Sequence, residues 1–260
     1  MVQQLQGASI ESRVARYQEL RNAVPAEILE DFDKNLKMSW IYHDSAIEGV
    51  VYTQDELLAA IAEEEPEDGA LTPVYDEIRN HLRAIAMLEE YAEKKRFSLS
   101  LDVIKKLYAV LAPEELEGKG QPTYRKDMPL HRLYFHEISQ PEKISYKMRQ
   151  LVTWMNAPET KRSTHAVRLA SRAHAQLLQI YPFPRQSGKV ARLVLNLILM
   201  RQGYPPVVFH ATQRQRYYEA LKNNEDAVAN FVNQALISSA ESSIAYLEEI
   251  IATKEAEENS

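Results

Sequence analysis

Residues 174–203, HAQLLQIYPFPRQSGKVARLVLNLILMRQG, decide how this chain folds. The pattern predicts a helix, a tight loop and a second helix. The first helix ends near Ile180, because the proline that follows Tyr181 disfavours helical geometry there. Ser187 can cap the second helix through its hydroxyl. Gly203 ends that helix as the residue just beyond its last turn.

The second helix is apolar on almost every face, which is typical of a buried central helix. Its apolar side chains are Val190, Leu193, Val194, Leu197, Ile198 and Met200.

Three cations surround the start of this helix. Lys189 and Arg192 are three residues apart and share a face, and Arg185 lies in the loop before them. A helix N-terminus attracts anions, so cations there oppose its dipole unless a negative group joins them. We therefore expect an anion pocket; a solvated, positively charged loop is the alternative. The loop is no Walker A motif, because Phe183 occupies its first glycine position and Val190 follows the lysine.

The loop resembles the signature of the Fic (Fido) family, H-P-F-x-[D/E]-G-N-G-R-x-x-R, in frame with residues 181–192. Similarity extends over roughly residues 38–250, and it includes Tyr124-Arg125 and the segment from Met148 to Asn156. The signature positions that match are Pro182, Phe183, Gly188 and Arg192, while Lys189 keeps the charge of the first arginine.

Four signature positions depart from the family. Tyr181 replaces histidine, Arg185 replaces the acidic residue, Gln186 replaces glycine and Ser187 replaces asparagine. The resemblance implies transfer of AMP from ATP to a protein hydroxyl. In that reaction the histidine takes the hydroxyl proton and the acidic residue holds a divalent cation. The helix N-terminus, asparagine and arginines hold the triphosphate.

The two candidate catalytic positions are therefore Tyr181 and Arg185. A phenol of pKa ~10 is only about 0.1 % ionised at pH 7, which makes it a weak base. An arginine should repel Mg²⁺, although it can pair with phosphate oxygens itself. We expect no Mg²⁺; ATP or another nucleotide stays open as a ligand. The resemblance assigns nucleotide contacts to Ser187, Gly188, Lys189 and Arg192.

A second resemblance lies upstream. Asp44-Ser-Ala-Ile-Glu48-Gly49 is similar to the family's inhibitory motif [S/T]-x-x-x-E-[G/N], with Asp44 departing at the first place. The resemblance implies that Glu48 pairs with Arg192 and blocks the site of the γ-phosphate. The alternative is an ordinary surface glutamate at the end of a helix.

Helical spacing recurs through the rest of the chain, and Thr53-Gln-Asp-Glu56 resembles a capping box. The one good strand candidate lies within residues 130–136, which the resemblance makes a β-hairpin flap that aligns protein targets. We predict an all-α, Fic-like helical core with this small hairpin. The acidic run at residues 63–69 separates an N-terminal helical region with an inhibitory-like helix (1–68) from a Fic-like core (69–260).

Composition limits the partners. A net charge of −6 argues against a nucleic-acid or anionic-membrane binder, and the absence of cysteine excludes disulfides and thiol chemistry. No apolar run is long enough to span a membrane, and the N-terminus lacks the pattern of a signal peptide. We therefore expect a cytoplasmic protein. Its protein target or partner would dock on the Leu130–His136 flap, and self-association stays open because Fic proteins often form oligomers.

Three functions remain open at this level. The first is a degenerate Fic protein without AMP-transferase activity that binds a partner or a phosphate-bearing ligand. The second is an altered transferase that moves AMP or another phosphate-linked group to a protein hydroxyl without a metal. The third is a regulatory or antitoxin-like partner of an active Fic enzyme.

Overall fold

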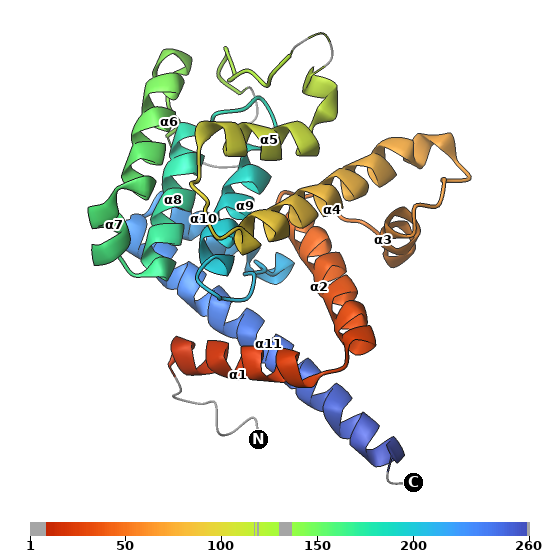
Figure 1. The fold of residues 1–260 in the computed structure, drawn as a ribbon. Helices are drawn as coiled ribbons and strands as arrows, with labels where there is room; N and C mark the ends of the chain where they lie inside the picture. The colour runs from red at the N-terminus through yellow and green to blue at the C-terminus, as the bar shows by residue number, and fades with distance from the viewer. Residues whose placement is uncertain (1–8, 117, 119, 130–136, 259–260) are drawn as a thin grey trace.

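The computed structural model describes residues 9–116, 118, 120–129 and 137–258. The described elements are helices throughout (Figure 1). The α-helices are α1 (Ile10–Ala23), α2 (Ala26–Ala46), α3 (Gln54–Ile61), α4 (Thr72–Glu93), α5 (Leu101–Leu111), α6 (Pro141–Asn156), α7 (Pro158–Ser163), α8 (Ala166–Ile180), α9 (Ser187–Met200), α10 (Arg214–Lys222) and α11 (Glu225–Glu258). Short 3₁₀ turns cover Gly69–Leu71, Pro113–Leu116 and Ala211–Gln213.

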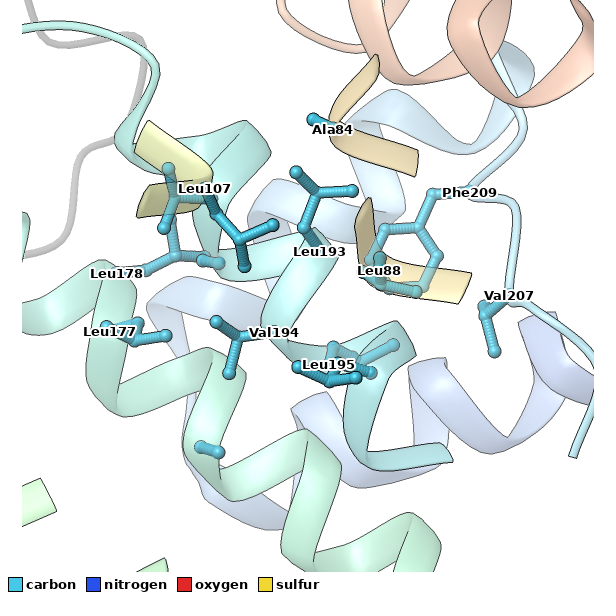
Figure 2. Close-up of a cluster of buried hydrophobic side chains, with 14 of the residues drawn as sticks. Ala84, Leu88, Leu107, Leu177, Leu178, Leu193, Val194, Leu195, Val207 and Phe209 are labelled. Atoms are coloured by element: carbon cyan, nitrogen blue, oxygen red, sulfur yellow. The ribbon is translucent and has the colours of Figure 1, made fainter. Parts of the chain in front are cut away.

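Helix α9 forms the centre of the molecule. Figure 2 shows Leu193, Val194 and Leu195 leaving this one helix in different directions, each into a set of apolar side chains. Those side chains come from α4, α5, α8 and the segment around Phe209. A helix with apolar residues on all faces must be covered on all faces, and this packing supplies the cover.

Local signals set several helix starts. Ser100 Oγ accepts a hydrogen bond from Val103 N at 3.2 Å and caps α5. At α3, Thr53 Oγ1 accepts from Glu56 N and Glu56 Oε2 accepts from Thr53 N, at 3.2 and 2.7 Å. The capping box predicted there is confirmed.

The predicted cap of α9 is wrong. Gln186, not Ser187, is the N-cap residue, with a left-handed φ of 57° and no side-chain capping bond. The hydroxyl of Ser187 instead accepts from Phe183 N at 2.9 Å and donates to Phe183 O at 3.1 Å. The hydroxyl of Ser187 closes the loop instead of capping the helix, because the buried backbone groups of Phe183 need hydrogen-bond partners.

The prediction of a β-hairpin also has to be corrected. The part of the chain that the structure describes contains helices and no strand, so the predicted fold class is corrected to all-α for those residues. Residues 130–136, where the hairpin flap was expected, lie outside the described part. The segments that flank them, 123–129 and 137–140, are irregular, with no ladder partner for a strand.

The first and last helices of the chain pack against each other on one side of the molecule. Helix α1 packs along α11, which runs beneath the core and beyond it (Figure 1). Tyr17 and Leu20 of α1 share a small apolar cluster with Ile244 and Leu247 of α11. Arg13 adds an ion pair with Glu241 at 2.8 Å.

The N-terminal region joins the main core as well. Trp40, Ile41 and Ile47, at the end of α2, belong to the same apolar cluster as α9. The boundary at residue 68 stays a prediction. Among the described helices, none is both long enough and apolar enough to cross a membrane.

Candidate functional site

The loop between α8 and α9 is held by its own backbone and by one buried arginine. Tyr181 ends α8 in the left-handed region, with φ 48°. Arg125, which is 4 % exposed, donates from Nε to Tyr181 O at 2.7 Å and also bonds Ser139 O. The backbone N–H of Arg125 donates to Pro182 O at 2.9 Å. Arg125 of the Tyr-Arg pair noted in the sequence therefore holds this loop in place.

An aromatic stack fixes the other side of the loop. The ring of Phe183 is fully buried and lies parallel to that of Tyr108, with centroids 3.9 Å apart and an interplanar angle of 4°. Together with the two hydrogen bonds between Ser187 and Phe183, this stack fastens the loop to α5.

Arg192 lies buried between two carboxylates. Its side chain is 2 % exposed, and its Nε donates to Asp44 Oδ1. Its Nη2 lies 3.2 Å from the carbonyl oxygen of Asp44 and 2.6 Å from Glu48 Oε1. Both acids come from the C-terminal end of α2 and the turn that follows, so this turn packs directly against the start of α9.

Lys189 is held in the same way by a third acid. Its side chain is 2 % exposed, and its Nζ lies 2.7 Å from Glu77 Oε1 on α4. Gln186 Nε2 donates to the same oxygen at 3.3 Å. Burial alone would raise the pKa of Glu77, but Lys189 and these hydrogen bonds hold it below its ordinary value.

We call Asp44, Glu48, Glu77, Lys189 and Arg192 the inner ion group. It contains three carboxylates and two cations, so its formal charge is −1. The positive charge that the sequence places at the start of α9 is therefore neutralised from within. Electrostatically, the site no longer favours a further anion.

A neutral histidine completes this region. His81 is fully buried, and its Nε2 lies 3.4 Å from Asp44 Oδ2. Burial, followed by the nearby charges of Lys189 and Arg192, lowers the pKa of His81 well below its usual value. The histidine therefore adds no positive charge to the inner ion group.

Arg185 does not join the other two cations. Its side chain is 53 % exposed, and its Nη1 lies 2.7 Å from Glu114 Oε1 in the turn Pro113–Leu116. The sequence predicted one anion pocket between Arg185, Lys189 and Arg192. The structure places Lys189 and Arg192 in the core and Arg185 at the surface.

Tyr181 is a poor proton acceptor in this setting. Burial, followed by the nearby carboxylate of Glu48, raises the pKa of Tyr181 to about 12. At neutral pH the phenol keeps its proton almost completely.

A magnesium site does not fit the residues at the loop. The family's acidic position carries Arg185, which is bound to Glu114. Within the described ranges, no group of three histidine, aspartate or glutamate side chains could hold a metal ion. Five cavities in the described part of the chain lie elsewhere, lined by none of the signature residues.

Sequence reasoning missed Glu77 and His81 and gave Asp44 no role. The sequence contained a signal for Asp44, because this residue departs from the first position of the inhibitory motif. Glu77 carried none, because it is one of many glutamates on an amphipathic helix.

Known proteins resemble this chain in sequence and in fold. Residues 98–199 match the Fic/DOC family. The protein adenylyltransferase Fic of Drosophila mojavensis is 28 % identical over 230 residues, which cover 85 % of this chain and 44 % of that protein. The chain thus spans less than half the length of this curated relative.

The solved structures agree on the fold. A Fic-domain-containing signaling protein from Bacteroides thetaiotaomicron superposes with a TM-score of 0.79 at 23 % identity, covering 93 % of this chain and 97 % of that one. Fic-1 from C. elegans gives a TM-score of 0.74 at 21 % identity, covering 92 % and 73 %. A more distant match is IbpAFic2 in complex with adenylylated Cdc42, with a TM-score of 0.51 at 18 % identity, covering 88 % and 75 %.

The family match covers the helices that build the loop, and the curated relative and the solved structures carry the same family name. Residues 98–199 of this chain therefore match the Fic/DOC family, and the fold around them is similar to that of solved Fic proteins.

Proposed function

We propose that this chain is a degenerate Fic protein that transfers no AMP and acts by binding a protein partner. One observation carries the proposal. Lys189 and Arg192, the two cations that would otherwise hold a triphosphate, form ion pairs with the carboxylates of the inner ion group. A nucleotide would have to displace buried, charge-assisted hydrogen bonds before it met either Lys189 or Arg192.

The chemistry of the loop supports the same reading. A general base contributes ~10²–10⁴ to a rate, and a phenol whose pKa is raised to about 12 supplies little of it. Arg185, where the family holds its metal, forms an exposed pair with Glu114. Neither the proton acceptor nor the metal anchor of AMP transfer is provided.

Glu48 keeps the position of the inhibitory glutamate, 2.6 Å from Arg192 Nη2. We propose that Asp44 makes this contact a permanent structural pair. Arg192 then has a carboxylate on two of its nitrogens, so loss of one acid leaves the other in place.

The relatives make a protein partner the natural class. The curated relative is named a protein adenylyltransferase, and the IbpAFic2 structure holds its protein target Cdc42. A protein surface can survive the loss of catalysis, whereas Lys189 and Arg192 are here paired with internal carboxylates. A regulatory or antitoxin-like role beside an active Fic enzyme is one form of this proposal.

A transfer assay with labelled ATP tests the proposal. The chain is incubated with ATP labelled on the α-phosphate and a cell extract, with and without Mg²⁺. We expect no labelled protein above the level of an extract without the chain. Label that appears with the wild type and disappears with Tyr181→Phe would establish the altered, metal-free transferase instead.

The partner is sought by cross-linking from the loop. A photo-reactive group at position 185, on the exposed side chain, should capture a partner that docks at the signature loop. The matched control places the same group at position 143, which is exposed on α6. Equal capture at both positions would contradict docking at the loop.

A further inference from the structure

A cavity of about 220 Å³ lies at the other end of α9 from the signature loop. We call it the basal cavity. Its walls come from the last turns of α9 and α6, from α7 and the start of α8, and from the segment between α4 and α5. Its lining residues are Phe97, Leu99, Met155, Asn156, Lys161, Thr164, Ala166, Leu169, Leu197, Ile198, Arg201 and Gln202.

The lining is apolar inside and positively charged at the edge. Leu99, Met155 and Leu197 are buried apolar side chains, while Lys161 and Arg201 supply two positive charges. The lining contains no aspartate or glutamate. This composition contrasts with a chain whose net charge is −6.

Lys161 and Arg201 are held in place by neutral groups and not by carboxylates. Arg201 Nη1 donates to the carbonyl oxygens of Tyr91, Ala92 and Lys94 at 2.7 to 3.2 Å, and its guanidinium lies 4.8 Å from the Phe97 ring centroid. Neither Arg201 nor Lys161 has a carboxylate within 4.0 Å in the described ranges.

Lys161 keeps donors available. Its Nζ lies 3.2 Å from Asn156 Oδ1, and an ammonium has three N–H donors. The amide nitrogen of Asn156 is itself engaged by Leu99 O and Val152 O, at 2.7 and 2.9 Å. The polar side of the cavity is thus a donor surface held in a fixed geometry.

We propose that the basal cavity binds a small organic carboxylate with an apolar body. The apolar walls would take the hydrocarbon part, and Lys161 with Arg201 would face the carboxylate. The volume lies below the ~300–1,000 Å³ typical of drug-sized ligands, so the ligand is small. The site is independent of the signature loop and of the function proposed for it.

Octanoate and octanamide form a matched pair of probes, since they differ in charge and share a chain. Each is titrated into the isotopically labelled full chain and followed by amide resonances in NMR. We expect saturable shifts for residues around Leu197 and Lys161, with octanoate bound at least ~10-fold more tightly than octanamide. Absent or non-saturable shifts, or equal affinity for the two probes, would overturn the proposal.

A variant isolates the charge. Lys161→Met should weaken octanoate about 10-fold and leave octanamide unchanged, whereas the control Lys143→Met, exposed on α6 outside the cavity, should change neither. Because Lys161 is exposed, its replacement leaves the core intact. Octanoate affinity that survives Lys161→Met would contradict the role assigned to the cavity rim.

Discussion

Asp44 is the residue that most distinguishes this site from the family's inhibitory motif. It stands where the family's inhibitory motif has a hydroxyl residue, and it is 4 % exposed. A hydroxyl could share a hydrogen bond with Arg192, but a carboxylate neutralises it. With Glu48 on the neighbouring nitrogen, one guanidinium is bound by two acids.

Removing Asp44 should therefore destabilise the fold. Asp44→Asn keeps the shape but leaves Arg192 with less compensation in the core, so we expect a loss of ~2–4 kcal/mol in the free energy of unfolding. Urea unfolding measures it. The matched control is Glu114→Gln, which breaks the exposed pair with Arg185 and should cost less than ~1 kcal/mol. Equal costs for the two variants would contradict the buried role of Asp44.

Tyr181 should remain a neutral phenol well into the alkaline range. Burial and Glu48 raise its pKa to about 12, so at pH 10 it should stay almost fully protonated. Carbon-13 labelling at tyrosine Cζ, with Tyr181→Phe to assign the resonance, measures this directly. A tyrosinate signal from Tyr181 at pH 9 would revive it as a base.

The sequence predicted the signature residues and, through the resemblance, the pair between Glu48 and Arg192, but it predicted neither Asp44 nor Glu77 as a partner. The signature and its departures were legible because they lie within twelve consecutive positions. The three acids lie far away along the chain: Glu77 is 112 residues from Lys189, and Glu48 and Asp44 are 144 and 148 residues from Arg192. The inhibitory-like motif marks Glu48, but no local pattern shows that Asp44 or Glu77 folds back onto these cations, so only the three-dimensional packing identifies those two acids.

At the scale of elements, the helix–loop–helix was well predicted. Proline at 182 and Gly203 bound the loop and α9 as expected, and Gly203 has the positive φ of 80° that ends such a helix. The cap was missed because Ser187 had two uses, and buried backbone groups of Phe183 claimed its hydroxyl. The predicted hairpin is wrong for the described residues, which contain no strand; a strand candidate needs a neighbouring strand, and a short apolar run does not supply one.

The contact between α2 and the turn at Ala211–Gln213 should be sensitive to acid. The ring of His43 lies against that of His210, with centroids 3.8 Å apart and an interplanar angle of 40°, and its Nδ1 lies 3.3 Å from Ala211 N. Burial, and then the neighbouring His210, lower the pKa of His43 to about 4. Because the unfolded chain binds a proton near pH 6.5, this contribution is complete above that pH and is lost as the pH falls towards 4.

Between pH 7.5 and pH 5 the wild type should lose about 2 kcal/mol more stability than His43→Gln. The variant keeps an oxygen that can accept from Ala211 N but carries no titrating group. Urea unfolding at the two pH values measures the difference. Parallel losses in the two proteins would show that His43 does not titrate as described.

At the scale of the whole molecule, the chain closes on itself through α1 and α11. Periodicity predicted helices at both ends of the chain, but it could not pair them, because an apolar stripe fits many partners. The all-helical class was predictable from spacing throughout. The order of packing around α9 follows from long-range contacts that no single segment encodes.

Leu247 tests whether this closure contributes to stability. Its side chain is fully buried in the cluster between α1 and α11, so Leu247→Ala should cost ~2–4 kcal/mol. The control Glu249→Ala, exposed on the same helix, should stay within ~0.5 kcal/mol. Thermal unfolding of both variants measures the difference, and a cost below ~1 kcal/mol for Leu247→Ala would mean that α1 is only loosely attached.

The central claim is that internal carboxylates hold the cations on which a triphosphate depends. Isothermal titration calorimetry of ATP, with and without Mg²⁺, tests it most directly on the wild type and on the double variant Asp44→Ser, Glu48→Gly. The account predicts no binding heat from the wild type up to ~5 mM ATP, and measurable binding once both acids are removed. Micromolar binding of ATP by the wild type would contradict it.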